Sequence, residues 1–169
     1  MVSLAIDDDG GDGPPPDRAP VVRRLAALAG FSEVHQHELV QARRLVRAAD
    51  RAPEERLAAA SAYVQTFFAQ TVEHFRREEE ELFPLYALHA GSTPTLERVL
   101  AEHMQLQGLV RALRTHLAAG EAPPDELRTL GRLLSEHVRI EERELFAEIA
   151  RVVPAAELER LAGSSRRRL

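Results

Sequence analysis

Apolar residues recur every three or four positions over most of this chain, which is the period of an α-helix. The pattern predicts four long helices, over residues 32–51, from 53 to 84 or slightly beyond, over 94–119, and from about 124 to a point before Pro154. Ser32 suits the N-cap of the first helix, and Gly120 suits the stop after the third. Short connections favour antiparallel neighbours, so we expect an all-α fold, an up-down-up-down antiparallel four-helix bundle.

Shorter segments flank the predicted bundle. The stretch IDDDGGDGPPP is acidic and rich in glycine and proline, which is typical of disorder. We expect a short lead-in helix, APVVRRLAALAG, to end at Gly30, and a short C-terminal helix to begin near Pro154. These signals predict a disordered segment over 1–18, a bundle domain over 19–162 and a flexible basic tail over 163–169.

Composition narrows the possible functions. The chain has 169 residues, the size of one domain, and a net charge of −5 without a broad basic stripe, which argues against nucleic acid. It has no cysteine, which excludes disulfides and thiolate metal sites. No stretch approaches the roughly 18 to 20 apolar residues of a membrane span, and the N-terminus does not resemble a signal peptide. We therefore expect a cytoplasmic protein that does not contact the membrane.

Four of the seven histidines fall on apolar helix faces, one on each long helix. His35 shares its face with Phe31 and Leu39, whereas His37 lies with polar residues, so we assign His35 inward and leave His37, His89 and His116 at the surface. At about 1.5 Å rise per residue, the four inward histidines fall within a turn or two of one layer. These are His35, His74, His103 and His137.

One buried histidine is most often a hydrogen-bonded core residue. Four in one layer without partners would cost several kcal/mol in unsatisfied polar groups, a cost that a metal centre removes.

Two glutamates complete this candidate site. Glu78 and Glu141 each follow an inward histidine by four residues, within the similar stretches HFRREEEELFP and HVRIEERELFA. Residues at that spacing share a helix face, and the second and fourth helices are diagonal in the bundle, so the two carboxylates could bridge two ions from opposite sides. Glu81 and Glu144 are also expected to face inward further along. Glu79, Glu80 and Glu142 are expected to point sideways or to solvent.

Imidazole and carboxylate ligands without thiolate suit iron, manganese or zinc. The order of the ligands differs from the Glu-x-x-His pattern of ferritin-like di-iron bundles. Spacing and ligand chemistry by themselves leave the metal open.

Together, the stretches HFRREEEELFP, EHMQLQGLVRAL and HVRIEERELF, with SEVHQHELVQARRL as a looser match, resemble the hemerythrin family in its bacterial HHE-domain branch, over about residues 30–150. The resemblance implies an oxygen-bridged centre of two iron ions, with manganese or zinc less expected. It implies that His35 and His74 hold one iron, that His103 and His137 hold the other, and that Glu78 and Glu141 bridge them.

The chain departs from the oxygen-carrying members of that family. Gln107 stands where they have a second histidine on the third helix, and Glu141 stands in place of an aspartate one residue further along. The second iron is then short of one nitrogen ligand, and Gln107, a water or another carboxylate could fill the place. This departure favours reaction with peroxide over simple reversible oxygen carriage.

We therefore expect a non-haem di-iron protein that binds or senses O₂ or a related small species such as peroxide or NO. One alternative is a di-iron enzyme that decomposes peroxide or acts as an oxidase. Another is a zinc-bound or metal-free structural or signalling bundle. The sequence names no protein partner.

Overall fold

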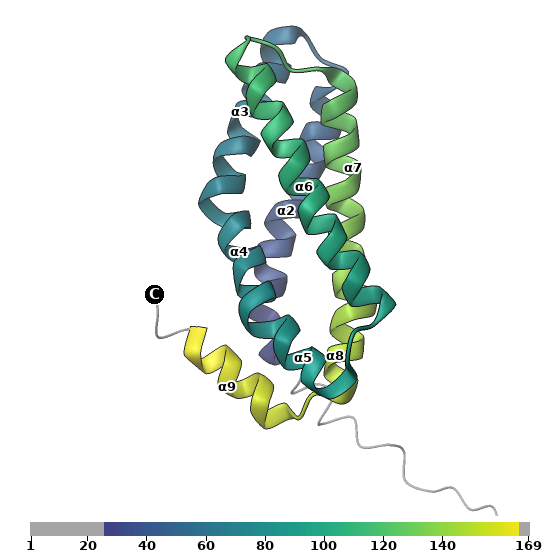
Figure 1. Cartoon of the computed structure of the whole chain (residues 1–169). Helices are drawn as coiled ribbons and strands as arrows, with labels where there is room; N and C mark the ends of the chain where they lie inside the picture. Colours follow the sequence, from purple (N-terminus) through teal and green to yellow (C-terminus); the bar gives the residue numbers. More distant parts are fainter. Residues whose placement is uncertain (1–25, 166–169) are drawn as a thin grey trace, which may run out of the picture.

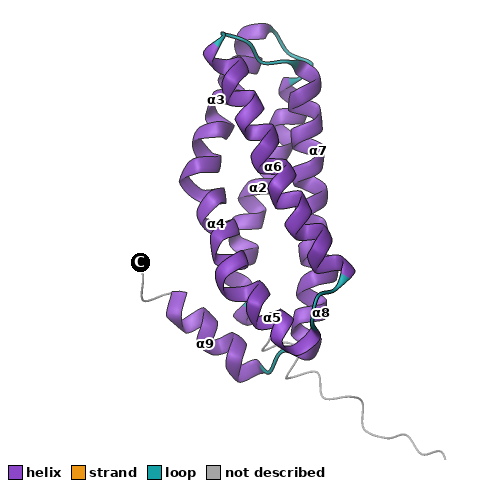
Figure 2. Cartoon of the chain, in the orientation of Figure 1, coloured by secondary structure: helices purple, strands orange, loops and turns teal. Residues whose placement is uncertain are grey.

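The computed structural model describes residues 26–165, and every long element in that range is helical, with no strand among these residues (Figure 2). The predicted all-α class is confirmed. The expected disordered segment over 1–18 lies outside the described residues, as do most of the lead-in helix and the last residues of the basic tail. Within residues 26–165, no helix combines the length and apolar character needed to cross a membrane.

Four long helical segments run along one axis, with their connections at the two ends (Figure 1). Segment α2 packs against α7 and α3, and α6 packs against the same two neighbours. The segments and their bounds are as follows: α2 (Ala29–Ala48); α3 (Pro53–Thr66), η1 (Phe67–Thr71), α4 (Val72–Arg77), η2 (Glu78–Leu82) and α5 (Phe83–Ala90) in one continuous run; α6 (Pro94–Ala118); α7 (Pro124–Ile140), η3 (Glu141–Leu145) and α8 (Phe146–Val152) in another; and the short α9 (Ala155–Ser165).

The start of the first long helix differs from the prediction. Gly30 was expected to end the lead-in helix and Ser32 to cap the next one, but both lie inside α2, whose N-cap position is Leu28 without a side-chain cap. Leu28 and Phe31 are both almost fully buried. Burial of these two side chains outweighs the cost of about 1 kcal/mol for a glycine within a helix.

Three single turns of π-helix interrupt the long helices, and two of them begin at a glutamate of the candidate site. Glu78 opens η2 and Glu141 opens η3. Hydrogen bonds in a π turn run from residue i to i+5, so the turn holds one extra residue. The segment that contains η2 passes through Pro84 and ends at Ala90. The two acidic stretches therefore form similar turns at equivalent positions.

The core consists of two apolar clusters that lie at opposite ends of the bundle. One cluster, near the connections α2–α3 and α6–α7, is centred on Tyr63, Phe67 and Leu106. The other, near α5, α8 and α9, is centred on Phe31, Tyr86 and Phe146. The buried histidines and glutamates lie between them, so apolar side chains close this polar layer above and below.

Candidate metal centre

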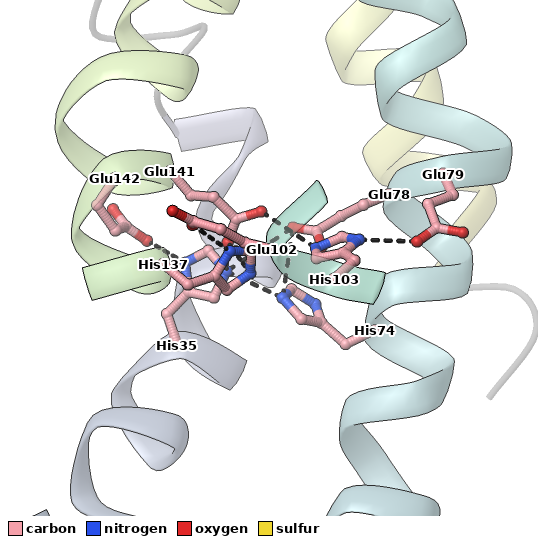
Figure 3. Close-up of polar contacts among 9 residues, drawn as sticks. All are labelled: His35, His74, Glu78, Glu79, Glu102, His103, His137, Glu141 and Glu142. Carbon is pink, nitrogen blue, oxygen red and sulfur yellow. Dashed lines mark hydrogen bonds and ion pairs between the residues drawn. The ribbon is translucent and has the colours of Figure 1, made fainter. Parts of the chain in front are cut away.

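Each long helical segment contributes one histidine to a single buried layer (Figure 3). These side chains are at most 2% exposed, because each lies on the apolar face of its helix. His37, by contrast, is exposed, although it is only two residues from the inward histidine of α2. The four inward residues are His35, His74, His103 and His137.

The Nε2 atoms of the histidines form two groups. The Nε2 atoms of His35 and His74 face each other at 2.9 Å, within hydrogen-bond distance. His103 and His137 form the second group, with ring centroids 4.8 Å apart. All four rings lie together in the polar layer, beside Glu78 and Glu141 (Figure 3).

Glu78 reaches both groups with different oxygen atoms. Its Oε1 lies 3.3 Å from Nε2 of His74, and its Oε2 lies 3.6 Å from Nε2 of His103. The carboxylate thus spans the space between the two pairs of histidines, as expected for a bridging ligand.

Glu141 approaches from α7 and η3, and it also touches both groups. Its Oε2 lies 3.1 Å from Nε2 of His35 and 3.3 Å from Nε2 of His137, while its Oε1 lies 3.6 Å from Nε2 of His103. Both glutamates are completely buried. The structure therefore brings together all six residues that the sequence singled out.

These separations fit a pair of metal ions. Donor atoms at about 2.0 to 2.2 Å from one ion lie about 2.8 to 3.6 Å from each other, and the separations above cover nearly the same range. Neither oxygen of Glu78 or Glu141 has a hydrogen-bond partner, and neither has Nε2 of His103 or His137. Buried polar atoms are seldom left without partners, and a cation bound here would be the partner of these atoms. Two sets of three or four ligand atoms close enough to hold an ion share Glu141.

Three carboxyl groups outside the set of six candidate ligands, here called the outer carboxylates, contact the Nδ1 atoms of histidine rings. Nδ1 of His35 donates to Glu142 at 2.7 Å, and Nδ1 of His103 donates to Glu79 at 2.7 Å. Nδ1 of His137 faces Glu102 at 3.2 Å. A carboxylate at Nδ1 fixes the tautomer and leaves Nε2 free to bind a metal. Nδ1 of His74 has no such partner.

Glu79 and Glu142, which were expected to point sideways or to solvent, are partly exposed, and each also contacts a histidine of a neighbouring helix. Each directly follows one of the two central glutamates, Glu78 or Glu141, so their equivalent places in the two acidic stretches were a usable signal. Glu102, 6% exposed and adjacent to His103, was missed altogether.

Glu81 and Glu144 were expected to face inward, and the structure does not place them fully inside. Glu144 is exposed and Glu81 is only half-buried. The π turns explain this, because the residues that return to the inner face lie four and five positions after Glu78 and Glu141 rather than three. Those positions hold apolar residues that are at most 3% exposed, namely Leu82, Phe83, Leu145 and Phe146.

Gln107 does not reach the site. It is exposed, whereas Leu106 is completely buried one turn beyond His103. The inward stripe of α6 continues three residues after His103, so the position four residues on points away. The suggestion that Gln107 fills a ligand place is therefore wrong.

The protonation of each residue in the layer depends on the charges of its neighbours. Burial by itself would lower the pKa of His35, but the neighbouring carboxyl groups of Glu141 and Glu142 raise it to about 12. Burial and then repulsion from His35 lower the pKa of His74 to about 3. The two neighbouring imidazoles therefore carry one positive charge between them.

The pKa values of the other candidate ligands are shifted by burial and by neighbouring charges as well. Burial would lower the pKa of His103, but Glu141 and Glu79 raise it to about 9. Burial, and then repulsion from Glu141, raise the pKa of Glu78 to about 8. Burial would raise the pKa of Glu141, yet attraction to His137 and then to His103 and His35 holds it well below its usual range. A cation entering this layer must displace protons from it.

Comparison with known proteins agrees with this geometry. The family model described as the hemerythrin HHE cation binding domain matches residues 26–149, which span all six candidate ligands. Neither the comparison with curated proteins nor that with solved structures returned a match.

Proposed function

Because the chain belongs to the hemerythrin HHE cation-binding domain family, we propose that it is a non-haem di-iron protein that binds or senses O₂, peroxide or nitric oxide. The iron ions would lie within an up-down-up-down four-helix bundle. The observation that carries the proposal is the buried layer of four histidines and two glutamates, in which the glutamate oxygens and Nε2 of His103 and His137 lack hydrogen-bond partners.

Each ion would be held by two histidines and by both bridging glutamates. His35 and His74 would hold one ion, and His103 and His137 the other. Four protein donors complete a tetrahedral zinc site, but they leave places open on a metal that prefers six ligands. A function based on binding a small molecule therefore favours iron over zinc.

The protein residues would control what reaches the ions. Bound iron would supply redox chemistry and open coordination places for a small ligand. The two apolar clusters exclude water from the layer and favour molecules of a few atoms. The carboxylates of Glu142, Glu79 and Glu102 would keep the imidazole rings in position.

A peroxide-decomposing enzyme is the second candidate. The exposed position of Gln107 favours it, because neither ion would then receive a third histidine. Both ions would keep open places, an arrangement suited to a two-oxygen ligand that contacts both.

Metal analysis combined with an optical spectrum tests the proposal. We expect about two iron ions per chain in protein loaded with Fe²⁺, and the absorption of an oxygen-bridged diferric pair after exposure to air. His35→Ala should lose most of the metal and His37→Ala should not, because only the first residue is buried in the layer. Glu78→Ala forms a second matched pair with the control Glu80→Ala, because Glu80 is exposed and lies two residues after Glu78. Equal metal content in parent and variants, or a colourless zinc protein, would refute it.

A further inference from the structure

A groove lined by arginines lies on the outer surface of the bundle, between α2 and α7. Its volume is about 280 Å³. Arg43 and Arg47 line it from α2. Arg132 and Arg139 line it from α7. All four side chains are exposed, so this arginine groove is separate from the buried layer of histidines and glutamates.

The floor of the arginine groove is a place where the two helices approach each other closely. Gly131, Ala42 and Val46 all line the groove. A Cβ atom at Gly131 would lie 2.6 Å from the backbone oxygen of Ala42 and 2.8 Å from Cγ2 of Val46. Because the helices are this close, long side chains from both of them can reach the same bound molecule.

The spacing along each helix places its arginines on the face that borders the groove. Arg43 and Arg47 are four residues apart, and residues at that spacing are neighbours on a helix surface. Arg132 and Arg139 are seven residues apart, which is about two turns. Ser135 stands between them, half-buried, and also lines the groove. Its hydroxyl group can donate one further hydrogen bond.

Neighbouring acidic side chains do not neutralise these arginines. Elsewhere on the bundle, Arg76, Arg98 and Arg128 form ion pairs with nearby carboxylates. Within residues 26–165, the four arginines of the groove form none. The chain has 27 acidic and 22 basic residues, so this is not for want of acidic residues. Glu136 is the one acidic residue that lines the groove, so its charge stays positive.

The chemistry of the groove suits phosphate. A guanidinium group is planar, carries five N–H donors and binds two phosphate oxygens at once. Its charge does not change over the physiological pH range. Small-molecule sites typically have volumes of about 300 to 1,000 Å³, so a groove just below this range fits a small ligand. Like charges four residues apart on a helix repel, and a bound anion would relieve that repulsion.

We propose that the arginine groove binds a small anion that carries phosphate groups, such as pyrophosphate or a phosphomonoester. Arg43 and Arg47 would hold the anion from α2. Arg132 and Arg139 would hold it from α7, with Ser135 as an additional donor. The site uses none of the six candidate metal ligands, so it does not depend on the proposed function.

Isothermal titration calorimetry of the full chain with sodium pyrophosphate, at fixed pH and ionic strength, tests this site. The parent should bind one pyrophosphate per chain. The groove variant, Arg43→Gln combined with Arg132→Gln, removes one charge from each helix. Its dissociation constant should rise roughly tenfold or more, because two charge-assisted contacts are lost. Both side chains are exposed, so the fold should be retained.

Arg111→Gln combined with Arg151→Gln is the matched control. Both of these arginines are exposed and lie outside the groove, so the control has the same net charge as the groove variant. Its dissociation constant should stay within about twofold of the parent's, because salt screens exposed charges that do not contact the ligand. The six candidate metal ligands are the same in all three proteins. Any pyrophosphate bound at the metal centre would therefore affect them equally.

The melting temperature provides a second readout. Pyrophosphate should raise the melting temperature of the parent and of the control, because a ligand that binds only the folded chain stabilises it. It should raise that of the groove variant much less.

The remaining outcomes would overturn the proposal. If the parent binds no pyrophosphate, the groove is a solvated face. Equal weakening in the groove variant and the control would mean that pyrophosphate responds to net charge alone. If an oligo-aspartate peptide of comparable charge binds the groove as tightly as pyrophosphate does, the groove selects acidic peptides as readily as phosphate, and the ligand class is wrong.

Discussion

Replacing Glu79 with alanine is the sharpest test of how the outer carboxylates support the centre. Glu79 accepts a hydrogen bond of 2.7 Å from Nδ1 of His103, while its neighbour Glu80 pairs only with Arg76 at the surface. Both belong to the run of four glutamates, so a change in net charge alone would affect metal binding equally in the two variants. Contact with a ligand histidine is what distinguishes them.

The expected effect follows from the exposure of Glu79. Loss of an outer partner of a metal-binding histidine typically weakens metal affinity ten- to hundredfold, or about 1.4 to 2.7 kcal/mol. The side chain of Glu79 is 39% exposed, so water can partly replace the lost acceptor. We therefore expect Glu79→Ala to weaken binding about tenfold, at the lower end of this range.

Competition with a chromophoric chelator, at fixed pH and ionic strength, measures this affinity. Glu80→Ala should match the parent, and Glu79→Gln should retain most of the affinity, because its amide oxygen still accepts from Nδ1–H. Equal weakening in Glu79→Ala and Glu80→Ala would point to net charge. Unchanged metal affinity in Glu79→Ala would show that the hydrogen bond from His103 to Glu79 does not contribute to metal binding.

Two further predictions concern protons and helix packing. Loading the metal-free protein with metal at pH 7 should release about three protons, because His35, His103 and Glu78 have pKa values raised to about 12, 9 and 8 and must give up their protons to bind. Metal affinity should therefore rise between about pH 7 and 9. A weakly buffered titration with a pH indicator that shows no proton release would contradict this prediction. Gly131→Ala should destabilise the bundle by about 1 to 3 kcal/mol in thermal or urea unfolding, because the new Cβ would lie 2.6 Å from a backbone carbonyl oxygen of α2. Gly108→Ala is the control, because Gly108 has open space around it, and this change should leave stability unchanged or raise it. Equal changes in stability for the two variants would mean that the close approach of α2 and α7 does not require a glycine at position 131.

The sequence was sufficient for the class of fold and for the position of the six candidate ligands. Helical periodicity is a local property, so the face of each histidine could be read within its own helix, including the choice of His35 over His37. The four-residue spacing of Glu78 from His74 and of Glu141 from His137 also lies within one helix. Their common layer followed from the rise per residue and the antiparallel order.

Tertiary structure decided the features that depend on more than one helix or on the phase of a helix. The π turns add a residue, which turned Glu144 outward and could not be counted from a regular period. The contacts of Glu79 and Glu142 with histidines cross between helices, so they depend on the rotation of one helix against another. The start of α2 at Ala29 was decided by burial of its first turn rather than by capping residues. Local periodicity fixes which way a side chain points from its own helix, but only packing fixes what it meets there.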